Sequence, residues 1–168
     1  MRKILLIILA ILIHQTSNAQ LNKIGNNEFA KIKFQGKSIS EIAKTNGEKN
    51  KVDALFGSFF SEKNYSLPVL GREYWNDDLF IRFENDSGQG SNYSLAYVKV
   101  KNSNIEVEVN GVIYKIGDDI SKFNNFNMIQ SLHSKMVAIV DARTSSASLS
   151  FNFDLKTNKA TNIELNFY

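Results

Sequence analysis

Few residues of this sequence could take part in nucleophilic or acid–base chemistry. Beyond residue 19 there is a single histidine, His133, and the chain has no cysteine. A serine nucleophile needs a base beside it, and the Ser/Thr-rich residues 144–148 lack the Gly-x-Ser-x-Gly turn that exposes such a serine. We interpret His133 as a structural residue near the end of a helix, where the helix dipole favours its positive charge.

Carboxylates occur in pairs at Asp77-Asp78 and Asp118-Asp119. Neighbours in sequence point to different sides, so neither pair can share a proton as an acid/base pair must. Helix capping and strand entry explain both pairs better. A glycosidase would need acids from distant strands, and Glu106, Glu108 and Glu164 could meet on one sheet face. A carboxylate-based hydrolase is therefore a remote alternative.

Residues 84–92 are rich in oxygen ligands and glycine, as a calcium loop would be. They lack the alternating acids and the closing glutamate of an EF-hand. Gly88-Gln89-Gly90 is not a nucleotide-binding turn either, because no helix start or third glycine follows it. We interpret the segment as a hairpin loop, so the sequence predicts no metal site, no cofactor and no enzyme activity.

The first 19 residues have the parts of a cleavable secretory signal. Arg2 and Lys3 give a positive start, residues 4–13 are apolar, and Ser17-Asn18-Ala19 offers small residues to a signal peptidase. The apolar run is too short to cross a bilayer, and no cysteine is present to carry a lipid. We expect cleavage after Ala19 and a periplasmic or secreted product, residues 20–168, with no stable membrane anchor.

The charge of the expected product argues against nucleic acid as a partner. Loss of Arg2 and Lys3 lowers the net charge from +3 to +1, because residues 1–19 contain no acid. Binding to nucleic acid depends on neutralising phosphates, which a nearly neutral domain does poorly. A single domain of this length buries enough surface to fold without disulfides, which fits the absence of cysteine.

An internal repeat organises the sequence. Residues 31–42 align with residues 112–123, Ser94-Leu95 corresponds to Ser148-Leu149, and residues 104–107 correspond to residues 162–165. The matches keep their order along the chain, as repeats do. The identical pairs of the first match are Ile32/Ile113, Gly36/Gly117, Ile39/Ile120 and Ser40/Ser121. We place the first repeat at about 28–110 and the second at about 111–168.

Each copy has a strand that ends at glycine and a helix that starts on a polar cap. The first cap is Ser38, with Glu41 completing a capping box, and the second is Asp118 or Asp119. Strands with alternating polarity follow each helix. Leu79, Ile81 and Phe83 alternate with polar residues, and so do residues 105–109, 149–154 and 163–167, while Asn110-Gly111 predicts a type I′ hairpin.

The predicted fold class is therefore α+β: an antiparallel sheet covered on one face by helices and built from two tandem strand-helix-strands repeats. This arrangement resembles the tandem-repeat beta-lactamase inhibitor proteins and the outer-membrane assembly lipoproteins. Gly117-Asp118-Asp119-Ile120-Ser121-Lys122-Phe123, after the hairpin, is also similar to bacterial immunity-type proteins. The chain lacks the inhibitors' disulfides and the lipidated cysteine of the lipoproteins. The resemblance implies binding to another protein through the open face of the sheet.

The first copy is the longer one, and its extra residues fall between Lys44 and Asn92. Aromatic and arginine side chains are enriched at interface hot spots, so those in this insert are candidate contacts, together with polar residues of the open sheet face. The candidates are Tyr65, Arg72, Tyr74, Trp75, Arg82, Tyr97, Glu106 and Glu108, with Lys99, Lys101 and Glu164 on the same predicted face.

Two other interpretations of the insert stay open. Val52, Leu55, Phe56 and Phe59 could form a second core helix, with Trp75 as a core residue at the repeat junction. Alternatively, Tyr74 and Trp75 could form a stacking platform for a glycan or another small ligand. Our first hypothesis is an exported, non-enzymatic domain that binds a protein, as an inhibitor, immunity protein or envelope-assembly factor does.

Overall fold

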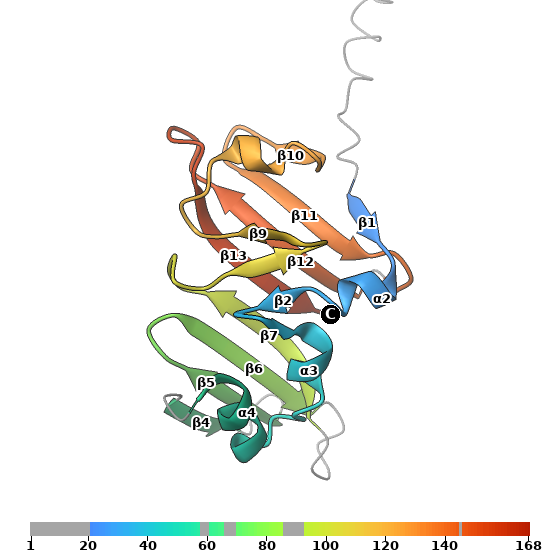
Figure 1. The fold of residues 1–168 in the computed structure, drawn as a ribbon, viewed down its shortest axis with the longest axis vertical. Coiled ribbons are helices and arrows are strands. Elements are labelled where there is room, and N and C mark those ends of the chain that lie inside the picture. Colours follow the sequence, from blue (N-terminus) through green and yellow to red (C-terminus); the bar gives the residue numbers. More distant parts are fainter. Residues whose placement is uncertain (1–20, 58–60, 66–69, 86–92, 145) are drawn as a thin grey trace, which may run out of the picture.

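The structure, a computed structural model, describes residues 21–57, 61–65, 70–85, 93–144 and 146–168, with the backbone alone at Ser61 and Tyr65. In this part of the chain nearly half of the residues lie in strands, and the three α-helices are only four to eight residues long (Figure 1). The predicted signal peptide and residues 86–92 of the predicted hairpin loop lie outside the described residues.

Nine strands form a large sheet in the order β1-β11-β12-β13-β7-β6-β5-β4, and β10 also pairs with β11. Only β1 and β11 run parallel; the other neighbours are antiparallel. The strands are β1 (Asn22–Ile24), β4 (Ser61–Tyr65), β5 (Leu70–Trp75), β6 (Leu79–Asn85), β7 (Ser94–Val100), β10 (Met128–Gln130), β11 (Lys135–Asp141), β12 (Ala147–Phe153) and β13 (Ala160–Phe167).

The large sheet has the same strand order on both sides of its middle. Strands β4 to β7 are four consecutive antiparallel strands, and β10 to β13 are another four. The two sets meet where their last strands, β7 and β13, pair antiparallel. The matched dipeptides of the predicted repeat do not occupy equivalent strands in this order, since Ser94-Leu95 lies in β7 and Ser148-Leu149 in β12. The repeat itself stays a prediction.

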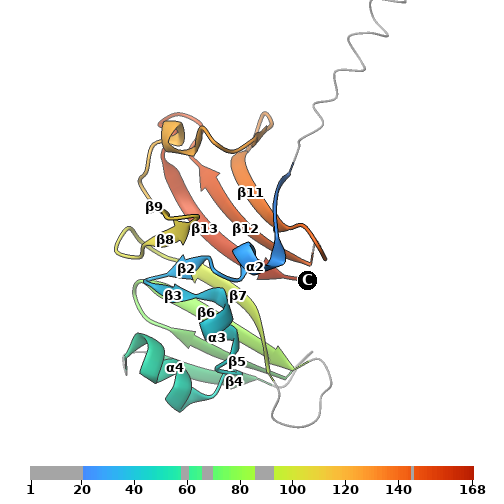
Figure 2. The ribbon, with the colours of Figure 1, turned by 45° about the vertical axis from the view of Figure 1, so that its right-hand side comes forward.

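A second, four-stranded sheet covers the middle of the large one (Figures 1 and 2). Its order is β3 (Lys37–Ser38), β2 (Lys33–Phe34), β8 (Val107–Val109) and β9 (Val112–Tyr114). The β8–β9 turn is the predicted hairpin, because Asn110 and Gly111 both have positive φ, 51° and 80°, as a type I′ turn requires. The strands of this sheet are only two or three residues long.

Short helices fill the space beside the second sheet, and their caps agree with the sequence. Ser38 and Glu41 form the predicted capping box of α3, and the Asp119 carboxylate accepts a hydrogen bond from the Ser121 amide at the start of η1. The helices are α2 (Asn26–Phe29), α3 (Ile39–Ala43), α4 (Lys49–Phe56) and the 3-10 helix η1 (Ile120–Phe123). His133 lies in the turn between β10 and β11 rather than at a helix end.

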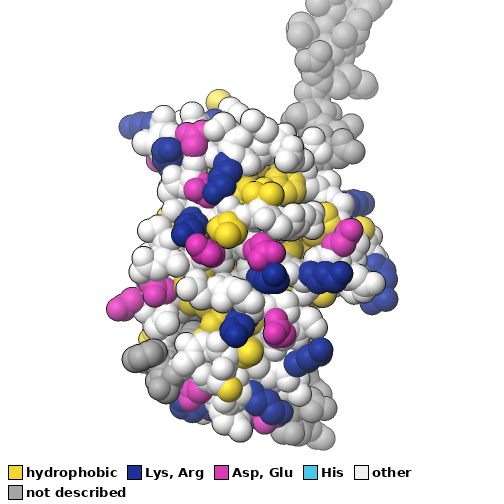
Figure 3. Space-filling view, viewed as in Figure 1, with side chains coloured by type: hydrophobic (Ala, Val, Ile, Leu, Met, Phe, Trp, Pro, Cys, Tyr) yellow, Lys and Arg dark blue, Asp and Glu magenta, His cyan; other side chains and the backbone are white. Residues whose placement is uncertain are grey.

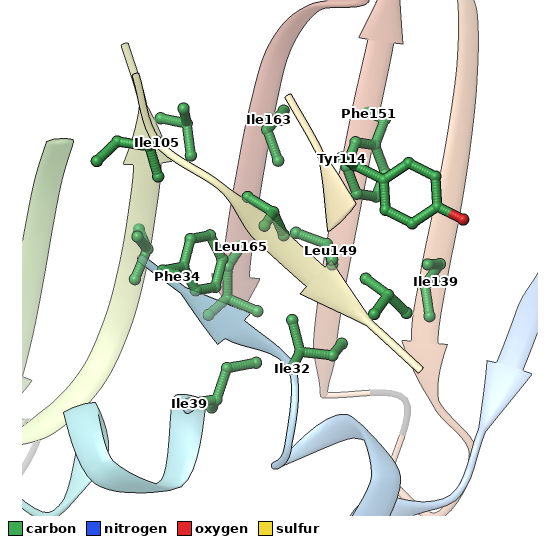
Figure 4. Packing of buried hydrophobic residues seen from close by; sticks show 14 of the residues in the cluster. Ile32, Phe34, Ile39, Ile105, Tyr114, Ile139, Leu149, Phe151, Ile163 and Leu165 are labelled. Atoms are coloured by element: carbon green, nitrogen blue, oxygen red, sulfur yellow. The ribbon is translucent and has the colours of Figure 1, made fainter. Parts of the chain in front are cut away.

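One continuous hydrophobic core lies between the two sheets. Figure 4 shows Phe34 of β2 and Tyr114 of β9 facing Leu149, Phe151 and other buried residues of the large sheet. The Phe151 ring centroid lies 5.4 Å from that of Tyr114 and 5.0 Å from that of Phe123 in η1. These rings join the large sheet, the second sheet and η1 in one cluster.

The predicted α+β class is wrong, because a second sheet, not a layer of helices, covers the centre of the large sheet. The caps at Ser38 and Asp119 are real, but the helices that begin there have five and four residues. Helices of that length bury few side chains. The apolar residues that close the core, such as Phe34, Val107 and Tyr114, therefore come from short strands.

Candidate functional site

One face of the large sheet packs against the core, and we call the other its open face. Along β6 the residues alternate between buried and half-buried, since Leu79, Ile81 and Phe83 lie in the core while Phe80 and Arg82 lie on the open face. The second sheet and the helices all lie on the core side of the large sheet (Figure 2). The open face is therefore where the described strands present side chains to solvent or to a partner.

Three aromatic side chains lie together on the open face. Trp75 in β5 stands directly opposite Phe80 in β6, and the Phe80 ring centroid is 5.8 Å from that of Tyr97 in β7, in an edge-on arrangement. All three are half-buried, and none belongs to the core cluster. We call Trp75, Phe80 and Tyr97 the aromatic strip. Large aromatic groups in contact with water are typical of binding surfaces.

A bulge in β7 gives Tyr97 its place in the strip. The β6–β7 register shifts between Arg82 and Phe83, so that Arg82 pairs with Tyr97 and Phe83 with Leu95. The extra residue, Ala96, allows Leu95 and Tyr97 to point to opposite faces, which strict alternation would forbid. The Arg82 guanidinium carbon lies 5.5 Å from the Tyr97 ring centroid, which is within cation–π distance.

The aromatic strip borders a hollow of about 440 Å³ at the β4–β7 end of the open face. Trp75 and Phe80 supply its apolar surface, and charged side chains surround them. The lining residues are Lys63, Glu73, Trp75, Phe80, Lys99 and Lys101. An apolar floor with a charged rim can hold a ring or an aliphatic group and fix its orientation by charge.

The charged residues beside the strip form one ion pair within β6 and one between β7 and β13. Arg82 Nε lies 3.0 Å from Glu84 Oε1, and Lys99 Nζ lies 3.2 Å from Glu164 Oε1 on β13. Burial and the neighbouring Glu164 carboxylate raise the pKa of the Tyr97 hydroxyl, so Tyr97 is a hydrogen-bond donor at neutral pH.

Glu164 stays ionised on this face. Burial alone would raise the pKa of its carboxyl group, but hydrogen bonds from Asn162 and Tyr97 and the Lys99 ammonium outweigh burial and hold the pKa below its usual value. A general acid needs the opposite shift. The geometry therefore makes Glu164 part of an ion pair rather than an acid catalyst.

The two halves of the open face differ in chemistry. On β4 to β7 and just after β7 it carries the aromatic strip and six charged groups, at Lys63, Glu73, Arg82, Glu84, Lys99 and Lys101, whereas on β11 to β13 most positions are small or uncharged.

 The lysine, arginine and glutamate positions follow from the strand registers. The uncharged positions of the second half are Ser148, Ser150, Asn152, Asn162 and Asn166. Features suited to binding are thus concentrated on one half of the open face.

A larger hollow of about 830 Å³ lies on the core side of the molecule, between β1 and β9. Figure 3 shows exposed hydrophobic groups above the second sheet on this side, with acidic and basic side chains scattered below them. The side chain of Asn22 in its lining is occupied by local contacts, because its amide group donates to the carbonyl oxygens of Asn127 and Ala138. Lys23 is the one charged residue in its lining. We therefore interpret it as a seam between strands and prefer the open face as the candidate site.

The structure brings three of the predicted contact residues together on the open face. Trp75, Arg82 and Tyr97 lie on neighbouring strands there, beside Lys99, as the interpretation of these residues as contacts requires. Trp75 is outside the core cluster, so it is not the core residue that the alternative interpretation proposed. The core helix of that alternative forms as α4 with Val52 fully buried, but it ends at Phe56, and Phe59 lies outside the described residues.

Arg72 and Tyr74 are not available as contacts, and neither lies in an inserted loop. Both belong to β5 and face the core, where the Arg72 Nη1 group and the Tyr74 hydroxyl donate to the Gly47 carbonyl oxygen at 2.7 and 2.6 Å. Tyr74 is fully buried, and burial raises the pKa of its hydroxyl to about 12. Consecutive strand residues point to opposite faces, so Tyr74 and Trp75 cannot form one stacking platform.

Glu106 and Glu108 do not share a face with Glu164. Glu108 is in β8 of the second sheet and forms an ion pair with Lys33 at 3.1 Å, and Glu106 lies just before β8 and pairs with Lys115 at 2.9 Å. The alternation predicts that these two glutamates point away from the core, but they belong to the second sheet and not to the large one. The proposed meeting of three acids for hydrolysis is therefore wrong.

Other predicted residues fall partly or wholly outside the site. Tyr65 is the last residue of β4 and pairs with Gly71, and its side chain lies outside the described residues. Among the residues that the structure describes, no cluster of His, Asp or Glu could hold a metal ion. The described helices include none that is long and apolar enough to span a membrane.

Sequence reasoning missed Phe80, Lys63 and Glu73. Phe80 could have been found, because it has the same parity as Arg82 in a strand whose inward residues were assigned correctly. Lys63 and Glu73 could not have been found from the sequence. They face each other only because β4 pairs with β5, and neither strand shows a clear alternation of polar and apolar residues.

Comparison with known proteins adds little to this site. No family model and no curated protein sequence matches the chain. A solved structure of a cysteine-rich secretory protein from Staphylococcus aureus is similar at a TM-score of 0.45 and 11% sequence identity. The likeness covers 88% of this chain and 50% of the staphylococcal chain, so this protein spans about half the length of that one.

Proposed function

We propose that this protein is an exported, non-enzymatic domain that binds another protein through the open face of its large sheet. The observation that carries the proposal is the aromatic strip: Trp75, Phe80 and Tyr97 lie side by side on the face that the core does not use. The leader-like residues 1–19 support export.

The charges around the strip suit a protein partner. Arg82 and Glu84 on β6 adjoin Lys99 on β7, and Glu164 on β13 continues the charged surface across the middle of the sheet. Mixed charges around an apolar centre give an interface its register and its selectivity. The inhibitor, immunity and envelope-assembly proteins named above are examples of such binding domains, and membership of any of them stays a prediction.

The test is a paired affinity capture from an extract of the cell envelope. The immobilised protein is compared with Trp75→Ala and with Ile113→Ala, a matched control that shortens an exposed apolar residue of β9, 41% exposed, on the other side of the molecule. We expect one protein to be retained stoichiometrically by the unchanged chain and by Ile113→Ala, and Trp75→Ala to retain at least about tenfold less of it, as loss of a hot-spot residue does.

Each variant is first checked for an unchanged unfolding midpoint, so that a lost partner reports a lost contact. Retention of the same protein by Trp75→Ala and the unchanged chain would place the interface elsewhere. Failure to retain any stoichiometric protein, together with binding to a saccharide array, would replace the proposal by a glycan-binding function.

A further inference from the structure

We infer that the hollow beside the aromatic strip takes an acidic segment of the partner, with an aromatic or aliphatic side chain seated on Trp75 and Phe80 and its carboxylates reaching the surrounding lysines. This inference rests on the proposed function and specifies the chemistry of the partner. Three of the six lining residues are lysines and one is a glutamate, so the hollow is positively charged.

The apolar floor of the hollow is built by strand pairing. Trp75 and Phe80 are directly opposite residues of the antiparallel β5–β6 pair, and their neighbours on either side, Ser61 and Lys99, are in the same register. Directly opposite side chains lie close enough to form one surface. The two rings therefore present a continuous apolar area without any movement of the backbone.

The lysines are held around this floor but keep free donors. Lys101 Nζ donates to the Asn76 carbonyl oxygen at 2.6 Å, and Lys99 Nζ is 3.2 Å from Glu164 Oε1. An ammonium group has three N–H donors, so each can also bind a carboxylate of a partner. Among the described residues, Lys63 has no ion-pair partner within 4.0 Å.

The shape and surroundings of the hollow favour a protein segment over a free small anion. The hollow is not closed off from the rest of the open face. Tyr97, Arg82 and Glu84 lie beside it on β6 and β7 and extend the same surface. A bound segment can thus extend along the sheet and use the polar groups beyond the hollow. Attraction between exposed charges is screened by salt, so binding at this site should weaken as ionic strength rises.

The test uses the fluorescence of Trp75, the single tryptophan of the chain, which reports on this hollow directly. The protein is titrated with a random copolymer of glutamate and tyrosine, with polyglutamate and with polygalacturonate, each at low and high salt. Excitation at the red edge of the tryptophan band avoids the tyrosines. We expect the copolymer to change the Trp75 emission with the highest affinity, and the change to be lost at high salt.

Two triple variants of equal charge separate this site from general attraction of polyanions. Lys63→Gln, Lys99→Gln and Lys101→Gln together should weaken copolymer binding about tenfold, as expected for the loss of three exposed charge pairs. Lys31→Gln, Lys44→Gln and Lys156→Gln, at exposed positions elsewhere, should leave it within about twofold of the unchanged chain.

Equal weakening by both triple variants, no change in Trp75 emission with the copolymer, or tighter binding of polygalacturonate would overturn the inference. The proposed function has a separate outcome. If the capture experiment retains a protein through Trp75 while the copolymer does not bind, the acidic segment is wrong and protein binding through the open face stands; if nothing is captured, the proposed function fails by itself.

Discussion

Replacing Phe151 by alanine is expected to lower the free energy of unfolding by about 3–5 kcal/mol. Phe151 lies in β12, in the interior of the large sheet, and is fully buried. Its ring meets Tyr114 of the second sheet and Phe123 of η1, at centroid distances of 5.4 and 5.0 Å. Truncation leaves a cavity where three elements meet, and the short strands and helix around it have little freedom to close it.

Chemical denaturation followed by the fluorescence of Trp75 and by circular dichroism measures this loss. Leu155→Ala is the control, because Leu155 is 45% exposed in the turn after β12, and the free energy of unfolding should change by less than about 0.5 kcal/mol. A loss below about 1 kcal/mol for Phe151→Ala would show that the rings do not join the two sheets as described.

Replacing Gly47 by alanine should cost about 2–5 kcal/mol of stability, for two reasons. The backbone of Gly47 has a φ of +62°, which an alanine adopts only with strain. A Cβ added there would lie 2.9 Å from Phe83 Cγ in the core. The backbone cannot easily move away, because the Gly47 carbonyl oxygen accepts hydrogen bonds from Arg72 and Tyr74.

Gly36→Ala separates the two contributions. Gly36 also has a positive φ, +77°, but nothing lies within 4 Å of its added Cβ. The alanine variant should therefore lose only the backbone share, about 1–2 kcal/mol. The steric contact with Phe83 accounts for the rest in Gly47→Ala. If the two variants lose the same free energy of unfolding, as measured by urea denaturation, the close packing of Gly47 on Phe83 is contradicted.

The local structure of this protein can be predicted from its sequence where a residue type favours one backbone geometry. Asn110-Gly111 predicts the type I′ turn because both residues tolerate positive φ, and Ser38 with Glu41 predicts a helix start because the two side chains satisfy backbone amides. The alternation from Leu79 to Glu84 likewise predicts which residues of β6 face the core.

The arrangement of the strands in the two sheets cannot be predicted from the sequence in the same way. Alternation shows which face of a strand is apolar, but not which sheet the strand joins, so the expected place of Glu106 and Glu108 on the open face of the large sheet is wrong. The second sheet is built from strands of two or three residues, too short to show a period. A helix cap predicts where a helix begins but not how long it is, and α3 and η1 hold too few residues to form the expected helical layer.

The candidate site was predicted in part. The sequence predicts Trp75, Arg82 and Tyr97 as contacts, and all three lie on the open face. Arg72 and Tyr74 are close to Trp75 in sequence, but strand parity points them to the core side of the sheet, where Arg72 stacks over Tyr93. Pairing between strands far apart in sequence decides such neighbourhoods, and composition does not reveal it.

The most direct test of binding through the open face uses the absence of cysteine from the chain. Single cysteines carrying a photoreactive group are placed at Glu73 and Asn166 on the open face, and at Lys31 and Ser121 on the opposite side. In an envelope extract, we predict cross-links to one partner from the first two positions and none from the other two. Cross-links to a stoichiometric partner from Lys31 or Ser121, with none from Glu73 or Asn166, would contradict binding through the open face.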